Sequence, residues 1–142
     1  MAAIVHCEIR VADLERAKRF YTTVFDWIIE PVGSGKYWLV RAGRAQYTTG
    51  QTSGIDAVLT LRQGAHPTEE QAGTGMGYVC NIEVTDIDET LKRVKATGGE
   101  VVRGKEPLEG VGFEAFCLDT EGNMFSVIHD EGLSALLPPT QA

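Results

Sequence analysis

The sequence contains the same opening pattern twice, about half a chain apart. Residues 4–21 and 77–94 superpose with a shift of 73 positions, which aligns four identical pairs: Cys7 with Cys80, Ile9 with Ile82, Val11 with Val84, and Asp13 with Asp86. In each copy an alternating apolar and polar run is followed by Asp and then by apolar residues at helical spacing. Because a fixed internal period is the signature of a repeated supersecondary unit, we expect two tandem copies of one strand-helix-strand unit.

The length and charge of the chain limit the classes of protein that it can form. Its 142 residues are 43% hydrophobic, enough for one compact core in which the two halves pack together. A formal charge of −7 without a segment rich in Lys or Arg argues against nucleic acid as a partner. The sequence has neither an apolar run of the about 20 residues that cross a bilayer nor a signal-peptide pattern at Met1. We therefore expect a cytoplasmic protein with no membrane partner.

The three cysteines are expected to be small buried hydrophobic residues. Cys7, Cys80 and Cys117 lie within apolar strand patterns, and no two of them form a Cys-x-x-Cys pair. This placement argues against disulfides, zinc ligands and nucleophiles.

Each half predicts the element order β-α-β-β-β. In the first half the pattern predicts a helix over 14–25, capped by Asp13, and strands over 4–11, 27–31, 36–41, 46–49 and 54–61. In the second half it predicts a helix over 87–97, capped by Asp86, and strands over 78–84, 100–103, 112–118 and 123–129. The organisation expected is a first module at 1–62, a linker at 63–77, a second module at 78–131 and a tail at 132–142. Such a chain is an α+β protein with curved mixed sheets and helices on their outer faces.

Strand alternation predicts which side chains of the two opening strands share a face. Cys7, Ile9 and Val11 should pack under the first helix, and Cys80, Ile82 and Val84 under the second. The opposite face then carries His6, Glu8 and Arg10 in one unit and Val79, Asn81 and Glu83 in the other. A face with so many polar groups should border water or a polar cavity.

Three motifs resemble those of the vicinal oxygen chelate superfamily, which includes glyoxalase I, extradiol dioxygenases, fosfomycin-resistance enzymes and bleomycin-binding proteins. The motifs are HCEIRVADLERAKRFY from His6, VTDIDETLKRV followed by GGEV from Val84, and FCLDTEGNMFSVI from Phe116. The resemblance extends from about Ile4 to His129 and implies two βαβββ modules whose sheets surround a cavity. It does not identify the reaction, because this fold supports many chemistries.

The resemblance also implies where a divalent metal would bind. Metal-dependent members take two ligands from each unit, one on its first strand and one on its last. His6 occupies the first position, whereas Val79 and Ser126 occupy the two positions of the second unit. The remaining position falls near Val58, or on Asp56 if the register differs by two residues. Because such a cation usually needs three or more protein ligands, we expect no tightly bound metal. If one binds, His6 and Asp56 are its candidate ligands.

The candidate ligand-binding residues are those expected on the polar face, with Ser126 and the aromatic side chains of the first hairpin: His6, Glu8, Asn81, Glu83, Ser126, Tyr37 and Tyr47. No catalytic residue is assigned, and serine catalysis is disfavoured because His129 should point to the opposite face from Ser126.

Two hypotheses remain open. One is a binding protein for a small organic molecule without a metal cofactor. The other is a metal-dependent lyase, isomerase or dioxygenase with a degenerate site. The apolar side chains of the tail between Leu133 and Leu137 further predict a homodimer.

Overall fold

The computed structural model describes residues 2, 4–45, 52–63 and 77–131. The chain divides into two compact units, Met1–His66 and Pro67–Ala142, which are described separately below. The division falls within the predicted linker 63–77, while the module boundaries themselves stay a prediction.

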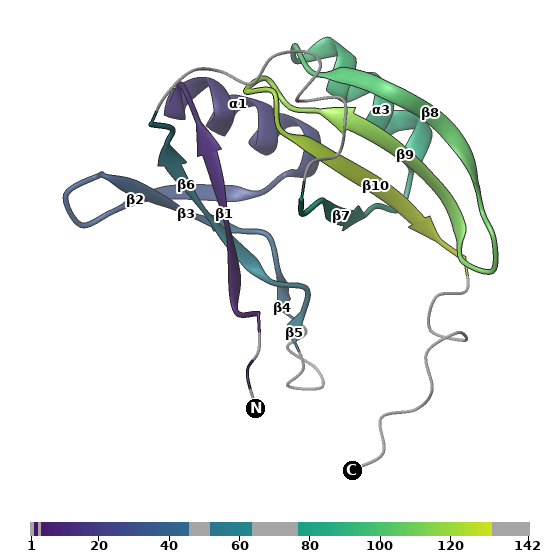
Figure 1. Ribbon diagram of the computed structural model, residues 1–142, viewed down its shortest axis with the longest axis horizontal. Helices are drawn as coiled ribbons and strands as arrows, with labels where there is room; N and C mark the ends of the chain where they lie inside the picture. The colour runs from purple at the N-terminus through teal and green to yellow at the C-terminus, as the bar shows by residue number, and fades with distance from the viewer. Residues whose placement is uncertain (1, 3, 46–51, 64–76, 132–142) are drawn as a thin grey trace. The chain divides into compact units, whose positions relative to one another are not determined.

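Unit 1 contains one four-stranded sheet with a helix on one face (Figure 1). Its strand order is β1-β6-β3-β2, in which β1 is parallel to β6 and the other neighbours are antiparallel. A short pair, β4-β5, extends beyond the sheet. The elements are β1 (His6–Val11), α1 (Leu14–Phe25), β2 (Ile28–Val32), β3 (Tyr37–Arg41), β4 (Arg44–Ala45), β5 (Thr52–Ser53) and β6 (Asp56–Leu61).

Unit 2 repeats this topology with a second four-stranded sheet (Figure 1). Its strand order is β7-β10-β9-β8, and β7 is parallel to β10 as β1 is to β6. The elements are β7 (Cys80–Glu83), α3 (Ile87–Ala96), β8 (Glu100–Leu108), β9 (Gly112–Leu118) and β10 (Met124–Asp130). The predicted α+β fold of two βαβββ modules is therefore confirmed.

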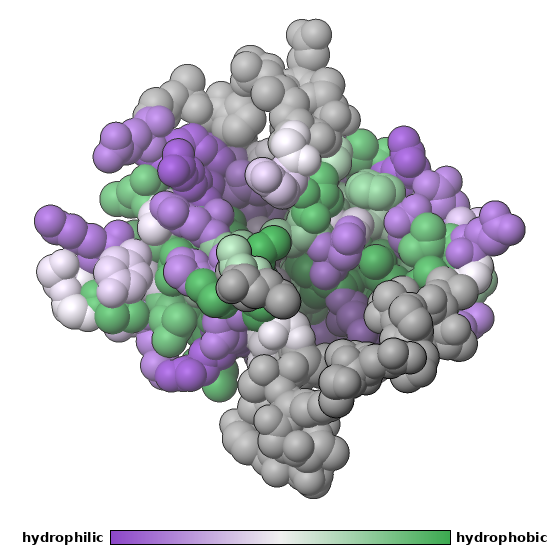
Figure 2. All heavy atoms as spheres, turned by 60° about the horizontal axis from the view of Figure 1, so that its bottom comes forward, coloured by the Kyte–Doolittle hydropathy of each residue, from purple (hydrophilic) through white to green (hydrophobic). Residues whose placement is uncertain are grey.

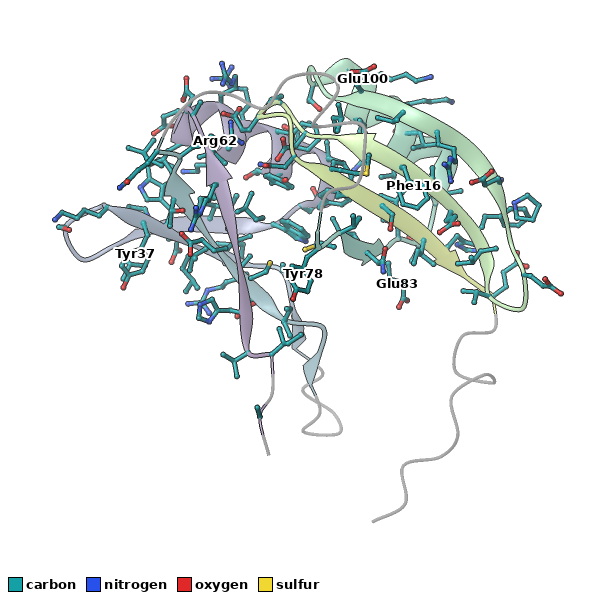
Figure 3. All side chains as sticks on the ribbon, in the orientation of Figure 1. Tyr37, Arg62, Tyr78, Glu83, Glu100 and Phe116 are labelled. Carbon is teal, nitrogen blue, oxygen red and sulfur yellow. The ribbon has the colours of Figure 1, made fainter. Side chains whose placement is uncertain are left out.

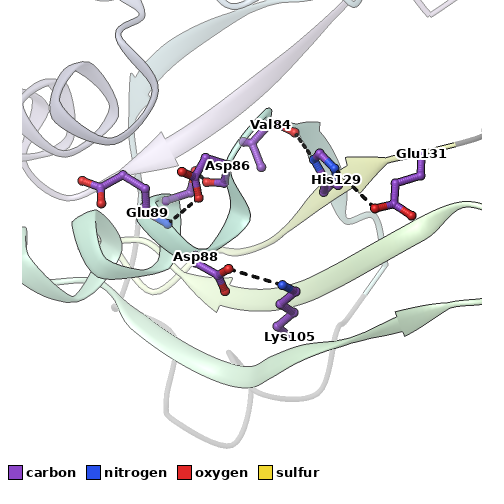
Figure 4. A network of polar contacts seen from close by, with 8 residues as sticks. Val84, Asp86, Asp88, Glu89, Lys105, His129 and Glu131 are labelled. Atoms are coloured by element: carbon purple, nitrogen blue, oxygen red, sulfur yellow. Dashed lines mark hydrogen bonds and ion pairs between the residues drawn. The ribbon is translucent and has the colours of Figure 1, made fainter.

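The two helices begin in the same way because the repeat places Asp at both N-caps. The Asp13 carboxylate accepts a hydrogen bond from the backbone N–H of Arg16 at 3.0 Å, and Asp86 accepts one from Glu89 at 3.0 Å (Figure 4). A side-chain acceptor at this position satisfies one of the backbone donors that the first turn leaves open. Both caps were predicted from the sequence.

The core of unit 1 lies between α1 and the sheet face that the alternation predicts. The helix buries Ala17, Phe20, Tyr21 and Val24, and the sheet buries Val11, Ile29, Val40, Ala57 and Leu59. Burying large aliphatic and aromatic side chains stabilises a fold by about 1.5–3 kcal/mol each. Cys7 and Ile9, on the same face nearer the start of β1, are only half-buried.

The core of unit 2 lies mainly beneath the antiparallel strands. α3 packs chiefly on β8 and β9, and the buried apolar residues of the sheet are Ala115, Cys117, Phe125 and Val127. The prediction that Cys80 lies beneath the helix is wrong, because it begins the edge strand β7 and is exposed. Of the three cysteines predicted to be buried, Cys117 is buried and Cys7 is half-buried.

Two predicted strands differ from the structure in other ways. The strand expected over 100–103 continues to Leu108 as β8, with two irregularities in its pairing to β9. Pro107 has no backbone N–H to donate. It is tolerated because β8 is an edge strand, and one side of an edge strand forms no hydrogen bonds to a neighbouring strand. The strand expected over 46–49 lies outside the described residues.

Charged and apolar side chains are interspersed over the surface drawn in Figure 2. The exposed large apolar residues include Ile28, Tyr37 and Leu61 in unit 1 and Tyr78 and Val102 in unit 2. Among the described residues, no helix is long and apolar enough to cross a membrane.

The pairing of β9 with β10 requires glycine at position 112, the first residue of β9. A Cβ atom at Gly112 would overlap the carbonyl oxygen of His129 and lie 3.0 Å from the backbone nitrogen of Glu131. Gly112→Ala should therefore lower the free energy of unfolding by about 2 kcal/mol or more, measured by urea denaturation. Gly104→Ala in β8 is the control, since no described atom lies within 4 Å of its added Cβ. Equal stability of the two variants would show that this backbone contact is absent.

Because the thiol of Cys117 is buried, we expect the free energy of unfolding to fall at alkaline pH. Burial raises the pKa of Cys117 to about 11, and the positive charge of Lys95 only partly offsets this shift. Between about pH 9 and 11 the unfolded chain loses the thiol proton while the folded chain keeps it, so this contribution to stability falls as pH rises. In urea titrations at pH 8 and 10.5, wild type should therefore lose more stability than Cys117→Ala. An equal loss in both proteins would contradict a buried neutral thiol.

Candidate functional site

The parallel pairing of β1 with β6 places two sets of polar residues on one face of unit 1. The register pairs His6 with Asp56 and Arg10 with Thr60. Register partners in neighbouring strands project to the same side of a sheet, and this side is opposite α1. The first strand thus presents His6, Glu8 and Arg10 as predicted, and β6 adds Asp56 and Thr60.

A recess of about 410 Å³ lies at the Arg10 end of this face. Within it the Thr60 hydroxyl donates a hydrogen bond of 2.7 Å to Glu8 Oε1, and Arg10 Nε lies 3.7 Å from the same oxygen. The recess is lined by polar side chains and one leucine, namely Glu8, Arg10, Lys36, Thr60, Leu61 and Gln63. Unit 1 alone therefore offers a surface with two cations, one carboxylate and a hydroxyl group.

The Glu8–Arg10 ion pair is too exposed to hold the recess rigid. The side chains of Arg10 and Glu8 are 69% and 46% exposed, and pairs of this kind contribute at most about 1 kcal/mol. The recess can therefore exchange this contact for one with a ligand at little cost.

His6 and Asp56 lie at the other end of the same two strands. His6 is exposed, whereas Asp56 is half-buried and its Oδ1 accepts a hydrogen bond of 2.9 Å from the backbone N–H of Gly43. The sequence left the ligand position open between Val58 and Asp56. The register places Val58 beside Glu8 and Asp56 beside His6, so Asp56 is the acidic neighbour of His6.

In unit 2 the corresponding face carries a hydrogen bond between β7 and β10. Ser126 is 0% exposed, and its hydroxyl donates to Oδ1 of its register partner Asn81. Glu83 projects from β7 as an exposed side chain (Figure 3). The structure thus brings together Asn81 and Ser126, two of the residues predicted for the site.

His129 makes its contacts away from Ser126, at the far end of β10. Its Nδ1 lies 3.4 Å from the carbonyl oxygen of Val84, and its Nε2 lies 3.8 Å from the Glu131 carboxylate (Figure 4). No contact joins His129 to Ser126 in the described part of the chain.

The remaining predicted residues have separate outcomes. Tyr37 stands at the start of β3 with 45% of its surface exposed (Figure 3), and Tyr47 lies outside the described residues. The sequence did not predict Arg10, Lys36 or Thr60 as site residues. The alternation that places His6 and Glu8 on one face also includes Arg10, so this signal could have identified it. The contact of Thr60 with Glu8 depends on a long-range register that no local pattern encodes.

The side chains at the metal positions of the resemblance fit a divalent cation poorly. His6 and Asp56 supply one imidazole and one carboxylate that already accepts a backbone hydrogen bond. Val79 is apolar, and the hydroxyl of Ser126 is committed to Asn81. Among residues 4–45, 52–63 and 77–131, no group of three or more His, Cys, Asp or Glu side chains could hold a metal ion.

Comparison with known proteins identifies the family. The sequence model of the Glyoxalase/Bleomycin resistance protein/Dioxygenase superfamily matches residues 3–127. The chain belongs to this superfamily. Relatives of this glyoxalase-superfamily chain include the probable lactoylglutathione lyase of Vibrio parahaemolyticus, 32% identical over 136 residues that cover 93% of this chain and 94% of the relative. The lactoylglutathione lyase of Haemophilus influenzae is 32% identical over 132 residues, covering 90% and 93% of the two chains.

The solved structures agree on the fold. A glyoxalase/bleomycin resistance protein/dioxygenase family enzyme from Burkholderia phytofirmans superposes with a TM-score of 0.66 and 18% identity. The match covers 91% of this chain and 99% of that protein.

Proposed function

We propose that this glyoxalase-superfamily protein binds a small organic molecule on the sheet faces opposite its helices, without a tightly bound metal. The observation that carries the proposal is the recess of unit 1, where polar groups converge on a sheet face that the fold leaves uncovered by α1. A few convergent polar groups in a concavity are typical of small-molecule sites.

The charges in the recess favour a ligand that carries an acidic group. Lys36 comes from the turn between β2 and β3 and Arg10 from β1, so two cations border one carboxylate, Glu8. Glu8 is already engaged by Thr60 and Arg10, whereas the Lys36 ammonium makes no ion pair with a described residue. Its three N–H donors are suited to a carboxylate or phosphate oxygen.

The donor chemistry at the metal positions supports binding without a cation. In unit 2 both positions are neutral, one apolar and one a hydroxyl, so they supply no charge to offset the dehydration of a divalent ion. The two candidate ligands of unit 1 alone fall short of the three protein ligands that such an ion usually needs.

A metal-dependent lyase is the second candidate function. It is supported by relatives named as lactoylglutathione lyases that align over nine-tenths of the chain, and by the register that sets Asp56 beside His6. If a divalent metal binds, these two residues would hold it, and it would polarise an oxygen of the substrate.

Ligand binding and lyase activity can be separated with two experiments on the full chain. In a thermal-shift screen of metabolites, ligands should raise the melting temperature of wild type. The affinity of ligands held in the recess should fall about tenfold in Lys36→Ala, and that of ligands held at the His6 end of the face should fall about tenfold in His6→Ala, because each variant loses a polar contact. Lys92→Ala, an exposed lysine on α3, is the matched control and should bind as wild type does.

Lactoylglutathione lyase activity, assayed with methylglyoxal and glutathione, should remain at background after Zn²⁺, Ni²⁺ or Mn²⁺ is added. Metal-stimulated turnover that Asp56→Asn abolishes would favour the second candidate instead. Unchanged ligand affinity in both Lys36→Ala and His6→Ala would show that the site lies elsewhere.

A further inference from the structure

The hydrogen bond between Ser126 and Asn81 fixes the orientation of an exposed carboxamide. Ser126 is completely buried on β10, so its hydroxyl needs a partner within the protein. That partner is Oδ1 of Asn81 on the parallel edge strand β7. With Oδ1 occupied, the two N–H donors of Asn81 Nδ2 are directed away from Ser126.

The opposite orientation of the amide is unfavourable. If Nδ2 faced Ser126, the buried hydroxyl would lose this acceptor, and a buried donor left without an acceptor costs about 1–3 kcal/mol. In the orientation observed, Nδ2 makes no hydrogen bond to any described residue. Asn81 itself is exposed, so the unused donors face the outside of unit 2.

The neighbours of Asn81 restrict the kind of acceptor that it can bind. Across the sheet from Asn81 and Ser126, the register continues to Phe116 on β9 and Arg103 on β8, whose guanidinium lies 5.2 Å from the centre of the Phe116 ring. Figure 3 shows Phe116 on β9 and Glu83 on β7.

The next row of the same face is acidic. The register places Glu83 and Glu114 on either side of Ile128. Arg103 is already paired with Glu106 at 3.6 Å. The two carboxylates within one row of the Asn81 amide therefore disfavour an anionic group and tolerate a neutral one.

We propose that Asn81 is a specificity-determining residue, whose carboxamide N–H groups, positioned by Ser126, donate to a neutral carbonyl oxygen of the ligand. The inference rests on the proposed function in assigning ligand binding to this face. It gives the two residues distinct roles: Asn81 touches the ligand, and Ser126 is a positioning residue that acts only through Asn81.

The identity of residue 126 sets the polarity of this site. An ionised carboxylate at this position would have no proton to donate and would attract Nδ2. Oδ1 of Asn81 would then face outward and present an acceptor. With serine at position 126, the Asn81 side chain instead presents hydrogen-bond donors.

The test uses two probes of nearly equal size, pyruvamide and pyruvate, titrated into the ¹⁵N-labelled full chain. Pyruvamide should shift the side-chain NH₂ resonances of Asn81 in a saturable manner, and the dissociation constant read from these resonances should be at least fivefold lower for pyruvamide than for pyruvate. Asn81→Asp keeps the shape of the side chain and removes both donors, so pyruvamide affinity should fall about tenfold. Glu83→Gln removes one of the two carboxylates in the next row, so it should narrow the difference in affinity between pyruvate and pyruvamide at Asn81.

Ser126→Ala should also weaken pyruvamide binding, while Ser126→Thr, which keeps the hydroxyl group, should restore it. If Ser126→Thr does not fold, as judged by the dispersion of the amide spectrum, the affinity of Asn81→Asp for pyruvamide decides whether the carboxamide donates to the ligand. Unshifted Asn81 resonances at high pyruvamide concentration, or equal affinity for the two probes, would overturn the inference. Calorimetry with Ni²⁺ tests the proposed function separately from the role of Asn81. Tight binding of Ni²⁺ would contradict ligand binding without a metal, whereas the Asn81 resonances test only the role of the carboxamide.

Discussion

The parallel pairing of the first and last strands in each unit determines where polar chemistry can occur in this protein. A parallel pair needs a crossover connection, and in unit 1 the chain makes it through α1, β2 and β3 before β6 returns beside β1. The helix covers one face of the sheet and buries Val11 and Leu59 beneath it. The other face is left for His6, Glu8 and their register partners Asp56 and Val58. Unit 2 repeats this arrangement through β7 and β10.

The duplication also explains how much of the fold could be predicted. Alternation, two aspartate caps and glycine turns are local signals, and they located both helices and most strands to within a few residues. Register is not a local signal, because it depends on which strands pair after the whole unit has collapsed. The sequence therefore left the choice between Val58 and Asp56 open, and it did not predict that Thr60 contacts Glu8. The prediction that Cys80 lies beneath the helix failed for a related reason. Alternation predicts the face of the sheet on which each side chain lies, but it does not predict how far a helix extends over an edge strand.

Function is determined by a few side chains on this shared scaffold. The relatives named as lactoylglutathione lyases show that the scaffold supports that chemistry in other chains. In this chain, neutral residues occupy the two metal-ligand positions of unit 2. One of them, Ser126, forms a hydrogen bond with Asn81. In the function that we propose, the oriented donors of Asn81 and the charged recess of unit 1 take the place of a cation. Hydrogen bonds of this kind can recognise the same oxygen atoms that a metal would bind, but they polarise them less strongly.

We propose that this protein holds no tightly bound metal, and elemental analysis of the purified full chain is the decisive measurement. Protein expressed in medium supplemented with Zn, Ni, Mn and Fe should, after dialysis without chelator, contain well under 0.1 equivalent of each metal, on the order of adventitious binding. One equivalent of any of these metals per chain, lost together with ligand binding on treatment with a chelator, would contradict the account and establish the metal-dependent alternative.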